Sequence, residues 1–205
     1  FHDDYLPTFN RDNVHLIDTD GKGIDEISER GIVANGKLVE LDCIIFATGF
    51  EVGTDYTRRS GYDVIGKGGL KLSNKWADGM KSLHGLHTRG FPNLFIISNA
   101  QAAFTTNFPH AMDESAQHIG YIVNQCLSGN ISTIEPSEEA EEAWVQEIIS
   151  LARLSESYQA SCTPGYYNNE GKPNPRSIQN ASYGKGPNPF FKRMKSWREE
   201  GGMQG

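Results

Sequence analysis

Alternating apolar and polar residues near the start of the chain predict a β-meander of three strands. The runs at 24–28, 32–34 and 37–39 are separated by turn residues. Asn35-Gly36 lies between the last two runs and is a strong hairpin signal, because both residues tolerate positive φ. A further alternating run at 14–18, closed by a turn, also predicts a strand.

Two unbroken apolar stretches predict buried strands, covered on both faces. The stretch at 43–47 continues the last strand of the meander and ends at Thr48-Gly49. The stretch at 94–98 follows the breaker Phe91-Pro92-Asn93. Between them, the runs at 62–65 and 70–72, which flank a turn in the glycine-rich stretch 61–69, predict a second hairpin.

Two long helices are predicted in the second half of the chain, because apolar residues recur there every three or four positions. Pro109 opens the first, where the missing N–H would lack a partner in any case. Its apolar positions are Met112, Ala116, Ile119, Val123 and Cys126. The second begins near 136–137, with apolar positions Ala140, Trp144, Ile148, Leu151 and Ala152. A short closing helix is predicted at 190–199, and the mixture of strands and helices favours the α/β or α+β class.

Composition and charge exclude several classes of protein. The chain has 205 residues, of which 37% are hydrophobic, so it can form a real core. Its longest apolar run is far shorter than the roughly 18 residues of a membrane span. A net charge of −7 without a dense basic cluster argues against a nucleic acid partner. Three widely spaced cysteines fit a reducing cytoplasm, and the start at Phe1 leads us to expect a piece of a longer protein.

No self-contained active site or metal site is expected from the motifs. The glycine fingerprints of dinucleotide and phosphate sites are absent, as are the hydrolase and zinc-protease motifs. His84 and His87 have no carboxylate or cysteine at ligand spacing, so we expect them to be loop histidines. For His110 and His118 on the first helix, packing or a surface hydrogen bond is the expected role.

The end of the stretch at 43–47 is the most suggestive local feature. A strand that ends in Ala47-Thr48-Gly49 lets the backbone approach a planar or phosphorylated ligand at the carboxyl edge of a sheet. A buried strand that simply ends in a turn is the alternative.

These residues, with Asp42 before the strand, resemble the ATG motif of flavoproteins that have two dinucleotide-binding domains. In that family the motif joins the NADP-binding domain back to the FAD-binding domain. Three further blocks are similar, in the same order, to the C-terminal part of type I Baeyer–Villiger monooxygenases: KWADG (75–79), GFPNLFI (90–96) and SCTPGYYNNEG (161–171). The branch that acts on bulky cyclic or steroid-like ketones is the most similar.

The resemblance implies the C-terminal part of an α/β flavoprotein. Residues 1–48 would end the NADP-binding domain, residues 49–160 would complete the FAD-binding domain, and residues 161–205 would form a mobile loop and a closing segment. The family's glycine fingerprints and catalytic arginine lie upstream of this region, so no catalytic residue is assigned here. The chain alone is expected to be inactive and to need the missing N-terminal portion.

The activity implied is the conversion of ketones to esters or lactones with FAD, NADPH and O2. An N-hydroxylating or S-oxygenating flavin monooxygenase is an alternative, although it would not be expected to carry the blocks at 75–79 and 161–171. A noncatalytic binding module or an incomplete, inactive fragment is a further alternative.

The resemblance also implies positions for cofactor contacts. Thr48 and Gly49 would lie near the cofactor. Asn107 and Phe108 would contact the flavin, whose negatively charged edge suits a helix N-terminus. A plain helix cap is the alternative for Asn107.

The remaining implied contacts involve the substrate and NADP. Phe104 would border the substrate cavity, or would be a core aromatic residue. Tyr166 and Tyr167 would lie in the loop that closes over NADP, at a place often held by tryptophan. Arg176 would face the phosphate of NADP, since a guanidinium suits that group, or would be a solvated loop arginine.

Overall fold

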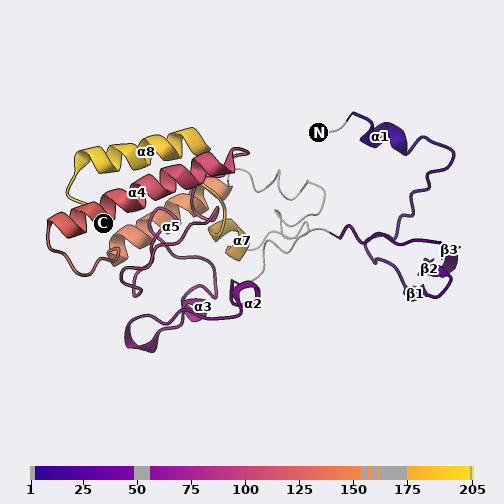
Figure 1. The fold of residues 1–205 in the computed structure, drawn as a ribbon, viewed down its shortest axis with the longest axis horizontal. Helices are drawn as coiled ribbons and strands as arrows, with labels where there is room; N and C mark the ends of the chain where they lie inside the picture. The colour runs from indigo at the N-terminus through magenta and orange to yellow at the C-terminus, as the bar shows by residue number, and fades with distance from the viewer. Residues whose placement is uncertain (1–2, 49–55, 154–156, 158–160, 162–174, 204) are drawn as a thin grey trace. The chain divides into compact units, whose positions relative to one another are not determined.

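A computed structural model describes residues 3–48, 56–153, 157, 161, 175–203 and 205. Most spatial contacts between Cα atoms fall within one of two compact units, Phe1–Gly49 and Phe50–Gly205 (Figure 1). Among the described residues, no helix has the length and apolar character needed to cross a membrane.

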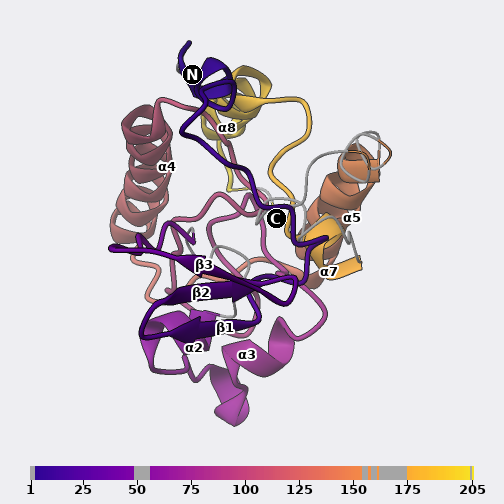
Figure 2. The same ribbon diagram turned by 90° about the vertical axis from the view of Figure 1, so that its right-hand side faces the viewer.

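The first unit contains a small antiparallel sheet with the strand order β1-β2-β3 (Figure 2). Its elements are α1 (Tyr5–Thr8), β1 (Glu26–Ser28), β2 (Gly31–Ala34) and β3 (Lys37–Glu40). Asn35 and Gly36 have φ angles of 51° and 71° in the turn between β2 and β3. The predicted meander and its Asn-Gly hairpin are therefore confirmed.

The other strands predicted in this unit are not formed. Residues 14–18 and 43–47 have no regular structure, and Ile45 is 85% exposed. A strand needs a neighbouring strand to accept and donate its backbone hydrogen bonds. In the described part of the unit, no strand pairs with either run, so an apolar sequence alone does not make them strands.

The second unit is built mainly from helices. Its elements are α2 (Tyr56–Ser60), η1 (Lys67–Gly69), α3 (Leu72–Lys75), α4 (Phe108–Ser128), α5 (Glu138–Arg153), α7 (Pro175–Gln179) and α8 (Pro187–Glu200). Helix α8 packs along α4, and α7 contacts α5 (Figure 1). The two predicted long helices and the closing helix are confirmed.

Predicted strand structure is again reduced in this unit. Residues 94–98 form no strand, and the hairpin predicted from the runs at 62–65 and 70–72 is represented by one antiparallel bridge between Ile65 and Lys71. In the described residues of this unit there is no sheet against which the run at 94–98 could pair.

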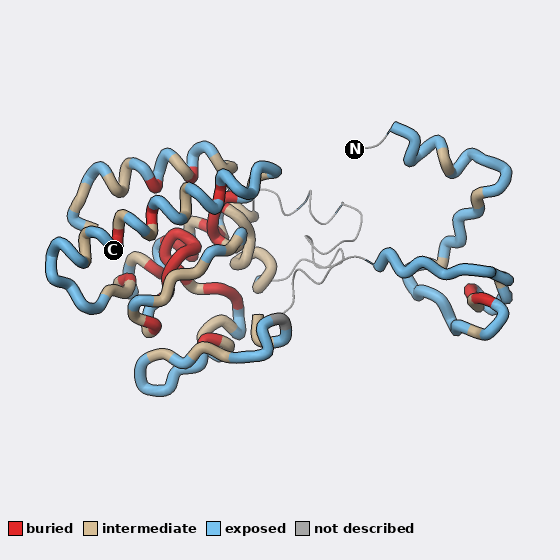
Figure 3. The backbone as a smooth tube through the Cα atoms, viewed as in Figure 1, coloured by how far each residue is buried: buried red, intermediate tan, exposed pale blue. Residues whose placement is uncertain are grey.

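Buried residues gather inside the second unit (Figure 3), and Trp144 of α5 belongs to its core cluster. The ring of Trp144 stacks on Tyr183 with 5.5 Å between centroids, and Phe190 of α8 meets it edge to face at 6.1 Å. The guanidinium of Arg193 lies 5.0 Å from the centre of the same ring. This packing fixes α8 and the segment before it on α5, and it confirms Trp144 and Ile148 as core positions of the second helix.

Helix α4 buries a different face from the one predicted. Ala111, His118 and Ile122 are buried, whereas Met112 and Val123 are each 41% exposed. The buried face includes a histidine, which a search for apolar residues does not count. The predicted apolar face is left without a covering surface among the described residues.

Candidate functional site

The start of α4 is the best-defined part of the predicted cofactor site. The side-chain oxygen of Asn107 accepts a hydrogen bond of 3.4 Å from the amide of His110, so Asn107 is the N-cap of the helix. The amide of Asn107 donates to the hydroxyl of Thr105 at 3.2 Å. These two hydrogen bonds fix Asn107 both to the start of α4 and to the turn at Thr105. The structure therefore establishes Asn107 as a helix cap.

The same helix start has the properties needed to face an anionic group. Phe108 is 41% exposed, the first turn of α4 contains no acidic residue, and Pro109 has no N–H to satisfy. The first amides of a helix lack partners within the helix and carry partial positive charge. An electron-rich ring edge would be stabilised there. The start of α4 therefore suits an electron-rich group, and its contact with a flavin stays a prediction.

The segment before α4 changes from buried to exposed within three residues. Ala102 and Ala103 belong to the core, whereas Phe104 is 45% exposed. Phe104 is thus not a core aromatic residue of this chain, and its ring is accessible beside the start of α4. Its contact with a substrate stays a prediction.

The other predicted cofactor residues are distributed over both units. Thr48 is exposed at the end of the first unit, and Arg176 is half-buried in α7 of the second. Gly49, Tyr166 and Tyr167 lie outside the described residues. Their assembly around one cofactor stays a prediction.

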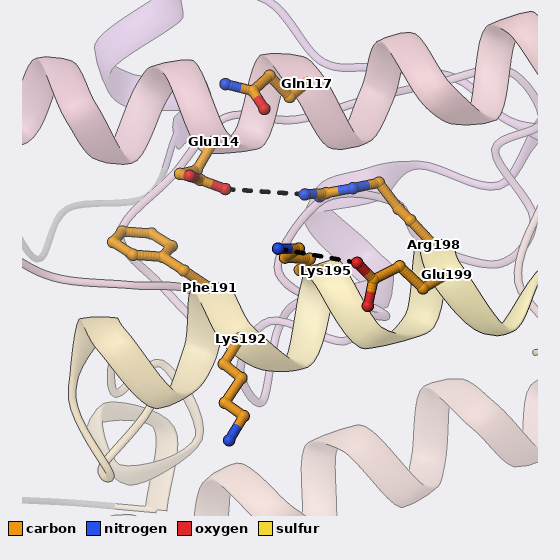
Figure 4. Close-up of a pocket in the computed structure, with 7 residues that line it drawn as sticks. All are labelled: Glu114, Gln117, Phe191, Lys192, Lys195, Arg198 and Glu199. Atoms are coloured by element: carbon orange, nitrogen blue, oxygen red, sulfur yellow. Dashed lines mark ion pairs between the residues drawn. The ribbon is translucent and has the colours of Figure 1, made fainter.

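A groove of about 540 Å³ lies between α4 and α8 (Figure 4). Arg198 and Lys195 in its lining pair with Glu114 at 3.9 Å and Glu199 at 3.7 Å. No predicted site residue lines it, and its charged walls do not suit a ketone.

Buried histidines form a second cluster of titratable groups. The ring of His84 is 5.5 Å from that of His118 and 5.0 Å from that of Trp144, in both cases edge to face. Burial, with the nearby charge of Arg198, lowers the pKa of His118 to about 3. Among the described residues, no group of three or more His, Cys, Asp or Glu side chains could hold a metal ion. The cluster therefore packs as neutral rings, as the sequence predicts for His118.

The chain is similar along its whole length to curated monooxygenases, although no family model matches it. It is 46% identical over 207 residues to pentalenolactone D synthase of Streptomyces exfoliatus, an alignment that covers 100% of this chain and 35% of that protein. It is 41% identical over 206 residues to the Baeyer–Villiger monooxygenase peniC of Penicillium patulum, covering 98% and 34%. The chain spans about a third of the curated relatives it matches.

The chain is also similar to solved structures of monooxygenases. A polycyclic ketone monooxygenase from Thermothelomyces thermophila is 34% identical with a TM-score of 0.84, over 99% of this chain and 33% of that one. At 25% identity, a steroid monooxygenase bound to NADP and a complex of OTEMO with FAD and NADP have TM-scores of 0.80 and 0.74. These two cover 98% and 96% of this chain, and 37% and 35% of theirs.

Proposed function

We propose that this chain is the C-terminal portion of a Baeyer–Villiger monooxygenase, and that the protein containing it oxidises bulky cyclic ketones to esters or lactones. The observation that carries this proposal is similarity over the whole chain to enzymes named for ketone oxidation. FAD is the proposed bound cofactor, and NADPH and O2 are the proposed co-substrates, since similar structures hold FAD and NADP. A reducing cytoplasm is the proposed location, and Cys43 and Cys126 are free thiols.

Bare apolar surface supports the proposal that this chain works within a larger protein. Met112 and Val123 on α4 are exposed, and so are Ile45 and Phe46 before the ATG motif. In the described part of the first unit only Gly31 and Ala34 are buried, which is too little for an independent core. Surfaces of this kind normally pack against further protein. We assign that role to the missing FAD- and NADP-binding portion.

Each predicted residue has a defined part in this proposal. Bound FAD would supply the oxygen-transfer chemistry. The start of α4, at Asn107 and Phe108, would stabilise negative charge on the edge of the flavin, with Thr48 and Gly49 close to the same cofactor. Phe104 would border the ketone.

Arg176 in α7 would pair with the phosphate of NADP. Tyr166 and Tyr167 would cover it.

The proposal is tested with the full-length gene product. On adding a bulky cyclic ketone, NADPH oxidation is expected to accelerate, and a lactone or ester carrying one atom from labelled O2 is expected in the mass spectrum. A hydroxylated amine or an oxidised sulfide, without any ester, would instead favour the other classes of flavin monooxygenase. Absence of FAD from the purified protein would contradict all of the flavin monooxygenase functions considered for the full-length protein.

The isolated 205-residue chain is expected to purify poorly and without flavin. Its exposed apolar faces favour association, and the upstream residues proposed to bind FAD are missing. Size-exclusion chromatography and the flavin absorbance band measure both effects. A yellow, monodisperse preparation with near-stoichiometric flavin would contradict this prediction.

A further inference from the structure

Gln101 is a fully buried polar residue that directly precedes the segment leading to Phe104 and α4. Its backbone has a φ of 58°, in the left-handed region that residues other than glycine seldom adopt. Such a conformation persists only where surrounding contacts hold it.

Those contacts use every hydrogen-bonding group of the side-chain amide. The Nε2 group donates to the carbonyl of Met80 at 2.6 Å and to the carbonyl of Gln179 at 3.0 Å. The Oε1 atom accepts from the hydroxyl of Ser82 at 2.6 Å. A buried amide with both donors and its acceptor engaged is rigid. Removing it takes a donor from the carbonyl of Gln179, whereas the carbonyl of Met80 still accepts from the side-chain amide of Gln179 at 2.9 Å.

The backbone of Gln101 joins two further segments. Its N–H donates to the carbonyl of Ala181 at 2.9 Å, and its carbonyl accepts from the indole N–H of Trp144 at 3.2 Å. Asn180 accepts from the amide of Met80 at 2.7 Å through its side-chain oxygen. Gln101 therefore ties the segment before α4 to the end of α7 and to α5, which lie beside each other (Figure 2).

We propose that Gln101 is a positioning residue that keeps α7 in register with the segment 102–108. This inference rests on the proposed function, in which α7 carries the NADP contact Arg176 and the segment carries Phe104, Asn107 and Phe108. Gln101 and Gln179 are 78 residues apart in sequence but are joined by one buried amide. The link aligns the NADP side of the site with its flavin and substrate side.

Loss of this alignment is expected to change which product the enzyme forms from O2, and that product can be measured. In the productive reaction, NADPH, a proton, O2 and the ketone give NADP+, water and the ester. When the ketone is misplaced, NADPH, a proton and O2 give NADP+ and hydrogen peroxide instead. The fraction of NADPH that ends in peroxide therefore reports the alignment.

The test uses the full-length holoenzyme and the substitution Gln101→Met, which keeps the length of the side chain and removes its amide. We expect the peroxide fraction, measured at saturating ketone, to rise about fivefold. The KM values for NADPH and for ketone are expected to rise by a similar factor, while the FAD content is retained. The matched control is Gln146→Met. Gln146 is exposed on α5 and donates only to Glu142 in the described part of the chain, so wild-type coupling is expected.

A second variant separates positioning from general loss of stability. Ser82→Ala removes the partner of the Gln101 Oε1 atom but leaves both donations from Nε2 intact. It is expected to lower the melting temperature while the peroxide fraction stays near that of the wild type. If Gln101→Met does not fold, Gln101→Asn, which keeps the amide on a shorter stem, is expected to show a smaller rise.

Two results would overturn the inference. One is wild-type coupling and KM values in Gln101→Met, or in Gln101→Asn where that variant is used. The other is equal uncoupling in Ser82→Ala at an equal loss of melting temperature. A wild-type enzyme without ketone-dependent NADPH oxidation would refute the proposed function itself, and the inference with it.

Discussion

Replacing Glu141 with alanine is expected to lower the free energy of unfolding of the second unit by about 3–5 kcal/mol. Glu141 is buried in α5 and accepts from the ammonium of Lys75 at 2.7 Å, the hydroxyl of Thr88 at 3.0 Å and the amide of Arg89 at 2.8 Å. The side chain of Lys75 is only 13% exposed. Alanine would leave its ammonium buried without this carboxylate. Hydrogen exchange of α3 and α5 in the intact protein measures the loss.

The neighbouring Glu142 is the matched control. It is exposed on the same helix and accepts from Gln146 at 2.8 Å, so Glu142→Ala is expected to change stability by less than about 0.5 kcal/mol. Replacing Glu141 and Lys75 together with apolar residues of similar size is expected to recover much of the loss, because no buried charge then remains. Equal protection in Glu141→Ala and Glu142→Ala would contradict the prediction.

This ion pair gives a structural meaning to KWADG, one of the blocks that are similar to Baeyer–Villiger monooxygenases. Lys75 is the first residue of KWADG, and Gly90 is the first of GFPNLFI. The amide of Gly90 donates to Glu135 at 2.8 Å, just before α5. The first block is thus fixed to α5, and the second to the segment just before α5, in each case through a carboxylate. Their residues hold the loops of the second unit in place, and none of them is among the predicted cofactor contacts.

The elements predicted correctly from sequence are those whose signals are local. Asn35-Gly36 specifies its own turn, and the spacing of apolar residues in α5 identifies both the helix and its buried face around Trp144. The run at 43–47 fails because a strand depends on a partner that the described residues do not supply. The face of α4 fails for a related reason, since its apolar side lacks the surface that would cover it.

The candidate site was partly predictable for the same reason. The cap at Asn107 follows from the residue type in front of Pro109, and the structure establishes it. Gln101 and Glu141 had no signal in the sequence. Each acts through partners at least 19 residues away, and for some of them the separation is larger, such as 43 residues for Trp144 and Gln101 and 52 for Arg89 and Glu141. Such contacts exist only after the chain has folded.

Lowering the pH from 7 to 4 is expected to destabilise the second unit strongly. Burial lowers the pKa of His87 to about 4, with the charge of Glu141 acting in the opposite direction. Burial lowers the pKa of His118 to about 3. Burial also holds the pKa of His84 well below its ordinary value, and the charges of His118, His87 and Arg193 act in the same direction. All three rings are therefore neutral in the folded protein at pH 7.

The sign of the effect follows from the proton count. Unfolded histidines bind protons below a pH of about 6.5, whereas the folded ones do not until their lowered pKa values are reached. The stability conferred by the neutral rings is fully present above a pH of about 6.5. It falls as the pH decreases from there to about 4 for His87 and to about 3 for His118. At pH 4, protonation linked to His87 and to His118 would each lower the free energy of unfolding by about 3 kcal/mol relative to pH 7.

The variant His118→Asn isolates one of these contributions. Arg198 donates to Nδ1 of His118 at 3.4 Å, and the oxygen of asparagine offers a neutral acceptor in its place. Because asparagine does not titrate, we expect the stability lost between pH 7 and pH 4 to shrink by about 3 kcal/mol. Urea unfolding at a series of pH values, followed through hydrogen exchange of α4 and α8, measures the slope. His110→Asn, on the exposed side of α4, is the control and should keep the wild-type slope. An unchanged slope in His118→Asn would show that this buried ring does not control the acid response.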